Sequence, residues 1–315
     1  MIPSGPRLGV HLPLGGGLLR AAERAGQIGA QAIQVFADNP SAWQRRAEPP
    51  THLPEFRARL EALDIRPVAI HASYLVNLAG PDPAFRASSI QVLESDLRAA
   101  PDYGARFVNV HTGSHRDTTV EEGIARIADG VAQVLREVNG AAEGATLVLE
   151  NAAGGGWSLG ATVEETAEIA NAAAALGVAP ARLGFCLDTA HAWGAGERMD
   201  EAAGVDALLD RFDRLIGLER LVMVHLNDSR SECGSRQDRH EHIGAGRIGT
   251  TGLRHLMIHP AMRGIPMLLE TPMDDGYDAI NLRRAEAVLA GIPLDPLPLE
   301  AFELSSGRNR TAAPT

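Results

Sequence analysis

The sequence contains no lysine, since all 29 basic residues among its 315 are arginine. This absence excludes a phosphate-binding P-loop lysine, a Schiff-base lysine and a lysine-paired nucleophile. Aromatic residues are also scarce, with 7 Phe, 3 Trp and 3 Tyr, too few for a surface that stacks many nucleobases. Because 40 acidic residues give a net charge of −11, a basic coat for nonspecific nucleic-acid binding is also disfavoured.

Cysteine and long apolar segments are equally limited. The two cysteines, Cys186 and Cys233, lie far apart and form no CxxC motif. No segment approaches the ~20 consecutive apolar residues of a membrane-spanning helix, and the first residues lack the pattern of a secretory signal. We therefore expect a cytoplasmic protein with reduced thiols and no membrane contact. Nothing in the sequence indicates an oligomer, so we expect a monomer.

The chain does contain a regular series of short β-branched or apolar runs, with room for a helix and two loops between successive runs. The runs lie at residues 7–12, 31–37, 66–72, 107–112, 146–152, 183–190, 221–228 and 266–272. Eight strands, each followed by a helix-compatible segment, predict an α/β fold of the (β/α)8 TIM-barrel type. We expect residues 1–292 to form this single domain, and residues 293–315 to form a wrapping segment and a disordered tail.

Helical signals support the segments between the strands. In residues 118–138 the apolar side chains recur at spacings of three and four, with Thr119 and Glu122 as a capping box and Gly140 as the stop. A second helix is expected to begin after Thr162 and to stop at Gly177.

Seven of the predicted strands end on a side chain that can bind a metal ion. These side chains are His11, His71, His111, Glu150, Asp188, His225 and Glu270. In a barrel the carboxyl ends of all strands open on one face, so these groups are expected to meet at one mouth. Burying so many unpaired polar groups is costly, and metal ions are the natural compensation.

Two local motifs add further ligand candidates. In CLDTAH, His191 follows Asp188 by three residues, so both can face the mouth across a tight turn. In the long loop after His225, a D-x-H pair places Asp238 and His240 on one side of an extended segment. Mixed histidine and carboxylate ligands favour Zn²⁺, or Mn²⁺ or Fe²⁺, over Ca²⁺ and Mg²⁺. Clusters of such ions serve the hydrolysis of phosphate esters.

These residues resemble endonuclease IV, the zinc-dependent apurinic/apyrimidinic endonuclease family. The most specific stretches are HASYLVNLA (71–79), GFCLDTAHAWGAG (184–196) and HLNDSRSECGSRQDRHEHIGAGRIG (225–249). The resemblance implies three Zn²⁺ at the mouth of the barrel. Its ligand sets are His71, His111 and Glu150 for one ion, Glu150 as a bridge with Asp188, His225 and Glu270 for the second, and His191, Asp238 and His240 for the third.

The resemblance also implies the reaction and the DNA contacts. The expected reaction is cleavage of the phosphodiester 5′ to an abasic site in damaged duplex DNA, which leaves a 3′-hydroxyl and a 5′-deoxyribose phosphate. Glu150 would bridge two ions and help position the nucleophile. The residues expected to contact DNA are the wedge pair Tyr74 and Leu75, with Asn39, Trp43 and Arg239. This sequence departs from the family pattern at Ser41, where an arginine usually intrudes into the DNA.

Two other functions are alternatives for the same predicted barrel and metal ligands. A xylose-isomerase-like sugar isomerase or epimerase shares the barrel, but such enzymes typically have a more carboxylate-rich shell and often a catalytic lysine. Five histidine ligands, the DRH loop and the lack of lysine disfavour it. A non-catalytic metal-dependent DNA-binding protein would be expected to have lost ligands, whereas the whole set is present here.

Overall fold

Eight parallel strands close into a barrel. The computed structural model describes residues 5–142, 144–272 and 276–307. The barrel strands are β1 (Arg7–His11), β2 (Ala32–Val35), β3 (Val68–His71), β4 (Ala105–His111), β5 (Thr146–Glu150), β6 (Leu183–Asp188), β7 (Leu221–His225) and β10 (Pro266–Leu269). They pair around the closed barrel in the order β1-β10-β7-β6-β5-β4-β3-β2. Each strand coincides with one of the eight predicted runs, so the (β/α)8 prediction is confirmed.

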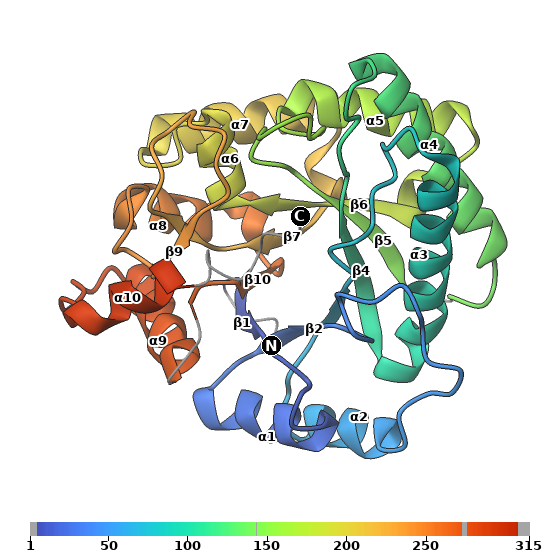
Figure 1. The fold of residues 1–315 in the computed structure, drawn as a ribbon. Coiled ribbons are helices and arrows are strands. Elements are labelled where there is room, and N and C mark those ends of the chain that lie inside the picture. The colour runs from blue at the N-terminus through green and yellow to red at the C-terminus, as the bar shows by residue number, and fades with distance from the viewer. Residues whose placement is uncertain (1–4, 143, 273–275, 308–315) are drawn as a thin grey trace.

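Helices surround the strands as an outer ring (Figure 1). They are α1 (Leu18–Ile28), α2 (Leu53–Ala62), α3 (Pro83–Tyr103), α4 (Val120–Glu137), α5 (Val163–Ala175), α6 (Thr189–Ala195), α7 (Ala202–Leu215), α8 (Gly249–Ile258), α9 (Tyr277–Ala290) and α10 (Leu299–Gly307). Among the described residues, no helix combines the length and apolar character needed to cross a membrane.

The helix signals in the sequence act as expected at the amino-terminal ends. Thr119 and Glu122 form the capping box of α4, in which the Thr119 hydroxyl accepts from the backbone N–H of Glu122 at 3.2 Å. The Thr162 hydroxyl caps α5 in the same way, and Gly177, with φ 86°, follows the last residues of that helix. Helix α4 ends at Glu137 with its cap at Val138, and Gly140, with φ 80°, follows in the turn that leaves the helix.

The barrel has an apolar interior separate from the core beneath the helices. One buried layer fills the inside of the barrel and consists of Ala32, Ala69, Phe107, Val148, Cys186, Met223 and Leu268. A much larger apolar cluster joins the outer faces of the strands to the helices. Both cysteines are free thiols, and Cys186 is buried in the interior layer, as a packing residue should be.

The long connection after β7 and the C-terminal region complete the fold. A short antiparallel pair, β8 (Asp228–Ser229) and β9 (His240–Glu241), lies within the β7–α8 connection. In the expected wrapping segment, residues 299–307 form α10, and the backbone carbonyl of Ala301 pairs with the Nε2 atom of buried His242 at 3.0 Å. The expected disordered tail falls on residues 308–315, which lie outside the described residues.

Candidate metal centre

A layer of polar side chains lies directly above the apolar barrel interior. Successive side chains of a strand point to opposite faces, so a residue two positions after an interior residue also points inward. All seven members of the interior layer are followed in this way by a polar residue at the mouth: Gln34, His71, Asn109, Glu150, Asp188, His225 and Glu270. Strand pairing sets His111 beside Glu150 and Asp188 beside His225. The alternation therefore brings together groups that are far apart in the sequence.

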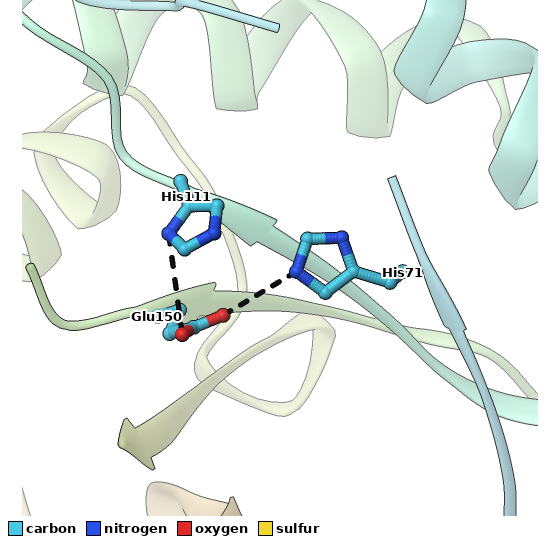
Figure 2. Close-up of side chains that lie close together, drawn as sticks. All are labelled: His71, His111 and Glu150. Atoms are coloured by element: carbon cyan, nitrogen blue, oxygen red, sulfur yellow. Dashed lines mark ion pairs between the residues drawn. The ribbon is translucent and has the colours of Figure 1, made fainter. Parts of the chain in front are cut away.

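The ligand atoms of these residues form three groups. Within each group, all ligand atoms lie within 4.8 Å of one another. The groups are His71, His111 and Glu150; Glu150, Asp188, His225 and Glu270; and Asp188, His191 and His240. Figure 2 shows the first group, with Glu150 between the two histidine rings. The Glu150 carboxylate oxygens lie 3.6 Å from His71 Nε2 and 4.0 Å from His111 Nδ1.

The third group differs in one respect from the ligand set that the resemblance implies. Asp188 stands where Asp238 was expected, so Asp188 belongs to two groups. Asp238 is nevertheless adjacent, because its two oxygens lie 3.3 Å from His191 Nε2 and 3.3 Å from His240 Nε2. All nine side chains expected to bind metal therefore lie at one mouth.

Most of the histidines have one ring nitrogen fixed by a hydrogen-bond acceptor. The Nδ1–H groups donate to backbone carbonyls, from His71 to Ala72 at 2.7 Å, from His191 to Asn151 at 2.9 Å and from His240 to Glu270 at 3.0 Å. Donation from Nδ1 leaves the Nε2 lone pair for another partner. This is the arrangement of metal-binding histidines, whose second nitrogen is usually held by a carbonyl or a carboxylate.

Several buried polar atoms at the mouth lack a hydrogen-bond partner within the described chain. They include Glu150 Oε1, His225 Nδ1 and His240 Nε2. Glu150 Oε1 and His225 Nδ1 face each other at 3.2 Å, and His240 Nε2 lies 3.3 Å from Asp238 Oδ1, so the lone pairs of these atoms repel unless a proton or a cation lies between them. A cation satisfies acceptors of this kind, and a mixed set of imidazole and carboxylate donors suits Zn²⁺, Mn²⁺ or Fe²⁺. The residues present therefore fit a metal cluster.

Neighbouring charges shift the pKa values of the candidate metal ligands. Burial alone would raise the pKa of Glu150, but the neighbouring His111 and His225 hold that pKa well below its ordinary value. Burial opposes protonation of His191, but Asp188 and other nearby carboxylates raise its pKa well above the ordinary value. In the metal-free mouth the Glu150 carboxylate is therefore ionised and His191 retains a proton, so metal binding at His191 must release that proton.

Amide side chains hold the carboxylates, and none of these amides is among the residues expected from the sequence. Asn109 Nδ2 donates to Glu150 Oε2 at 2.6 Å, and Asn227 Nδ2 donates to Asp188 Oδ2 at 2.7 Å. Gln34 contacts Glu270 and His225 across the barrel. Asn109 and Asn227 each lie two positions from a candidate histidine in the sequence, which is a usable signal. Gln34 has no ligand candidate near it in the sequence, so only the closed barrel identifies it.

The loop that supplies Asp238 and His240 is anchored from below by Asp228. Its buried carboxylate accepts backbone N–H groups from Ser229 at 2.8 Å, Gly246 at 3.0 Å and Ile248 at 3.0 Å. A Cβ atom at Gly246 would lie 2.5 Å from Asp228 Oδ1, so a side chain there would displace the anchor. The start and the end of the ligand loop are thereby tied to one carboxylate.

An open cavity of about 380 Å³ lies over the cluster. His71, His111, His191, Asp238, His240 and Glu270 line it, together with Tyr74, Arg239 and other residues. The Tyr74 side chain is 63% exposed, and its ring lies 5.1 Å from that of Phe36. Arg239 is exposed, and its Nη1 atom donates to the backbone carbonyl of Asp238 at 2.9 Å.

The other expected DNA contacts lie outside this cavity. Leu75 is half-buried beside Tyr74, while Asn39 is exposed and accepts from the backbone N–H of Ser41 at 3.0 Å. Trp43 is half-buried, and its ring meets that of Phe85 edge-on at 4.7 Å. Ser41 is exposed in the same loop.

Comparison with known proteins agrees with this geometry. A family model described as a xylose isomerase-like TIM barrel matches residues 22–292. The probable endonuclease 4 of Solibacter usitatus is 41% identical over 295 residues, which cover 93% of this chain and 99% of that protein. The probable endonuclease 4 of Halothermothrix orenii is 36% identical, over 89% of this chain and 100% of its own.

Solved structures also show similarity to endonuclease IV. Endonuclease IV from Thermus thermophilus is 38% identical and superimposes with a TM-score of 0.78, over 91% of this chain and 100% of its own. A D-tagatose 3-epimerase-like protein superimposes with a TM-score of 0.64 at 18% identity, over 96% of this chain and 99% of its own, and shares the fold alone. The chain belongs to the endonuclease IV family, within the xylose isomerase-like TIM barrels.

Proposed function

We propose that this protein is a DNA-repair endonuclease that hydrolyses the phosphodiester 5′ to an abasic site in duplex DNA. The products are a 3′-hydroxyl and a 5′-deoxyribose phosphate, as base excision repair requires. The observation that carries the proposal is the convergence of nine histidine and carboxylate side chains under one open cavity, with orphaned acceptor atoms among them. Membership of the endonuclease IV family supports the same reaction.

We further propose that the cluster holds three Zn²⁺ ions, for which Mn²⁺ or Fe²⁺ can substitute. His71, His111 and Glu150 would hold one ion, and Glu150, Asp188, His225 and Glu270 the second. His191, Asp238 and His240 would hold the third, with Asp188 close enough to contribute. Bound zinc would supply Lewis-acid stabilisation of the charge that develops on the phosphate and the leaving oxygen.

Glu150 has the central position among the catalytic residues we propose. Asn109 fixes one of its oxygens, which leaves Oε1 directed toward the imidazoles of His191 and His225, each at 3.2 Å. Because its pKa is held low by neighbouring histidines, the carboxylate stays ionised across the neutral range. A carboxylate held in this way can bridge two cations and orient the nucleophile with little movement.

The rim of the cavity supplies groups suited to damaged DNA. The exposed ring of Tyr74, followed by Leu75, can fill the gap left in a base stack by an abasic nucleotide. Extrusion of that nucleotide costs least because it has no base to unstack. Arg239 lies between two candidate ligands and can contact a phosphate. Asn39 and Trp43 would contact the duplex farther from the cavity, and we propose that one monomer suffices.

The net charge is consistent with a local DNA interface. Three Zn²⁺ ions would add six positive charges and change the net charge from −11 to about −5, with the added charge concentrated at the mouth. The absence of lysine limits the other cationic contacts to arginine. We therefore propose that DNA binding depends on the metal cluster and on few arginines, and weakens steeply as salt rises.

The decisive experiment is a nicking assay on duplex DNA that contains one tetrahydrofuran abasic analogue, with no added Mg²⁺. We expect near three zinc equivalents in the purified protein, cleavage only at the analogue, no cleavage of an intact duplex, and loss of activity after chelation that zinc restores. Fully metallated protein that leaves this DNA intact but interconverts a ketose and an aldose would instead establish the sugar-isomerase alternative.

A further inference from the structure

Gln34 reaches across the mouth to two candidate ligands of one metal group. It lies on β2, whereas Glu270 follows β10 and His225 ends β7, which are the second and third strands from β2 around the barrel. Gln34 Nε2 donates to Glu270 Oε1 at 2.7 Å, and Gln34 Oε1 lies 3.1 Å from His225 Nε2. The side chain of Gln34 has no solvent exposure.

The orientation of the Gln34 amide follows from its partners. An ionised carboxylate can only accept, so the amide NH₂ must face Glu270 and the amide oxygen must face His225. The oxygen then requires a donor, which is the Nε2–H of His225. Donation from Nε2 leaves the lone pair on His225 Nδ1, the buried atom without a hydrogen-bond partner in the described chain. That atom lies 3.2 Å from Glu150 Oε1 and 3.3 Å from Glu270 Oε2.

Gln34 also has a role that no backbone group duplicates. His71, His191 and His240 are oriented by backbone carbonyls, whereas His225 is oriented by a side chain. The same amide holds one oxygen of Glu270, which leaves Oε2 facing His225 Nδ1. His11 joins this contact, because its Nδ1 atom lies 3.0 Å from Gln34 Nε2 and 3.0 Å from Glu270 Oε1.

We propose that Gln34 is the positioning residue for the metal site formed by Glu150, Asp188, His225 and Glu270, because one amide sets the tautomer of His225 and the free oxygen of Glu270. This inference rests on the proposed metal cluster and adds a residue outside its ligands. Outer partners of metal ligands typically contribute about 10- to 100-fold to metal affinity. Gln34 therefore controls the affinity of one of the three sites and leaves the other two unaffected.

The test measures zinc affinity by competition with a chromophoric chelator, in the absence of DNA. Gln34→Met keeps the length of the side chain and removes both hydrogen bonds, whereas Gln34→Asn keeps the amide and shortens its reach. The matched control is Gln133→Met on α4, because Gln133 Nε2 also donates to a carboxylate, that of Asp129, at 2.7 Å, but on the outer ring.

We expect both Gln34 variants to bind one zinc equivalent about 10- to 100-fold more weakly than the wild type. The other two equivalents should bind as in the wild type, and Gln133→Met should bind all zinc normally. Normal affinity in either Gln34 variant overturns the proposal, and so does an equal loss at every site, which indicates a general structural role. If Gln34→Met fails to fold, Gln34→Asn decides by the same criteria. A wild-type protein that binds zinc but does not nick abasic DNA contradicts the proposed function and leaves this test intact.

Discussion

Asp96 offers a quantitative prediction about stability at a buried site that is not itself one of the proposed metal ligands. It lies on α3, is 3% exposed, and lines a cavity beneath the loop that carries Asn39 and Trp43. Burial raises the pKa of Asp96 from 3.8 to about 7, although Arg45 nearby lowers it and Asp38 raises it further. Replacement by asparagine keeps the shape and removes the ionisable group.

The sign and size of the effect follow from proton linkage. Because the folded pKa is raised, the carboxyl group imposes no penalty below about pH 4, where it is protonated in both the folded and the unfolded state. As the pH rises from about 4 to 7, the unfolded chain loses the proton first and wild-type stability falls, and above about 7 the penalty is constant. About three pH units between the two pKa values, at 1.36 kcal/mol each, give a penalty on the order of 4 kcal/mol.

We therefore expect Asp96→Asn to be more stable than the wild type by on the order of 4 kcal/mol at pH 8 and equally stable near pH 4. The assay is urea unfolding followed by circular dichroism at a series of pH values, with EDTA present so that metal does not contribute. Asp102→Asn is the matched control, since Asp102 is exposed on the same helix and lines the same cavity. Its change should stay within about 0.5 kcal/mol. No gain, or a loss, at pH 8 would mean that Asp96 is ionised and stabilised in the folded protein, contrary to a raised pKa.

Three further predictions concern the mouth. Glu150→Gln should abolish nicking and weaken the two zinc equivalents that Glu150 would hold, while circular dichroism stays native. Glu168→Gln on the exposed face of α5 is the control, and retained zinc and activity in Glu150→Gln would exclude the bridging role. Tyr74→Ala should weaken binding of abasic duplex by about 1–3 kcal/mol, roughly 5- to 150-fold, with little effect on intact duplex in a binding titration. Equal losses on both duplexes would contradict the wedge role. Arg239→Ala should weaken DNA binding and reduce the slope of log K against log salt by about 1. Arg66→Ala is the control and should change neither quantity, because Arg66 precedes β3 at the end of the barrel away from the mouth. An unchanged slope would show that Arg239 does not contact a phosphate.

Much of the fold could be predicted because its signals are local. A strand run such as residues 146–152 shows its β-branched and apolar character in a few consecutive residues, and the Thr119–Glu122 capping box lies within one helical turn. The rule that parallel strands open on one face then placed His111, Glu150 and Asp188 at a common mouth without coordinates.

The supporting contacts of the site could not be predicted because they join residues that are remote in the sequence. Asp188 belongs to two ligand groups because β6 and the first turn of α6 place it between His225 and His240. The anchoring of the ligand loop by Asp228 depends on backbone N–H groups up to 21 positions away.

The barrel, the chemistry of its ligands and the face on which they meet can be read from the amino-acid order, because strand periodicity and residue type are properties of the chain. Which side chains hold those ligands, and which acid is buried, depends on the folded arrangement. Gln34 forms a hydrogen bond with His225, which is 191 positions away in the sequence. Asp96 is desolvated because the folded chain buries this position of α3. Hydrogen-bond direction and desolvation depend on the three-dimensional neighbours of an atom, and closure of the barrel supplies those neighbours.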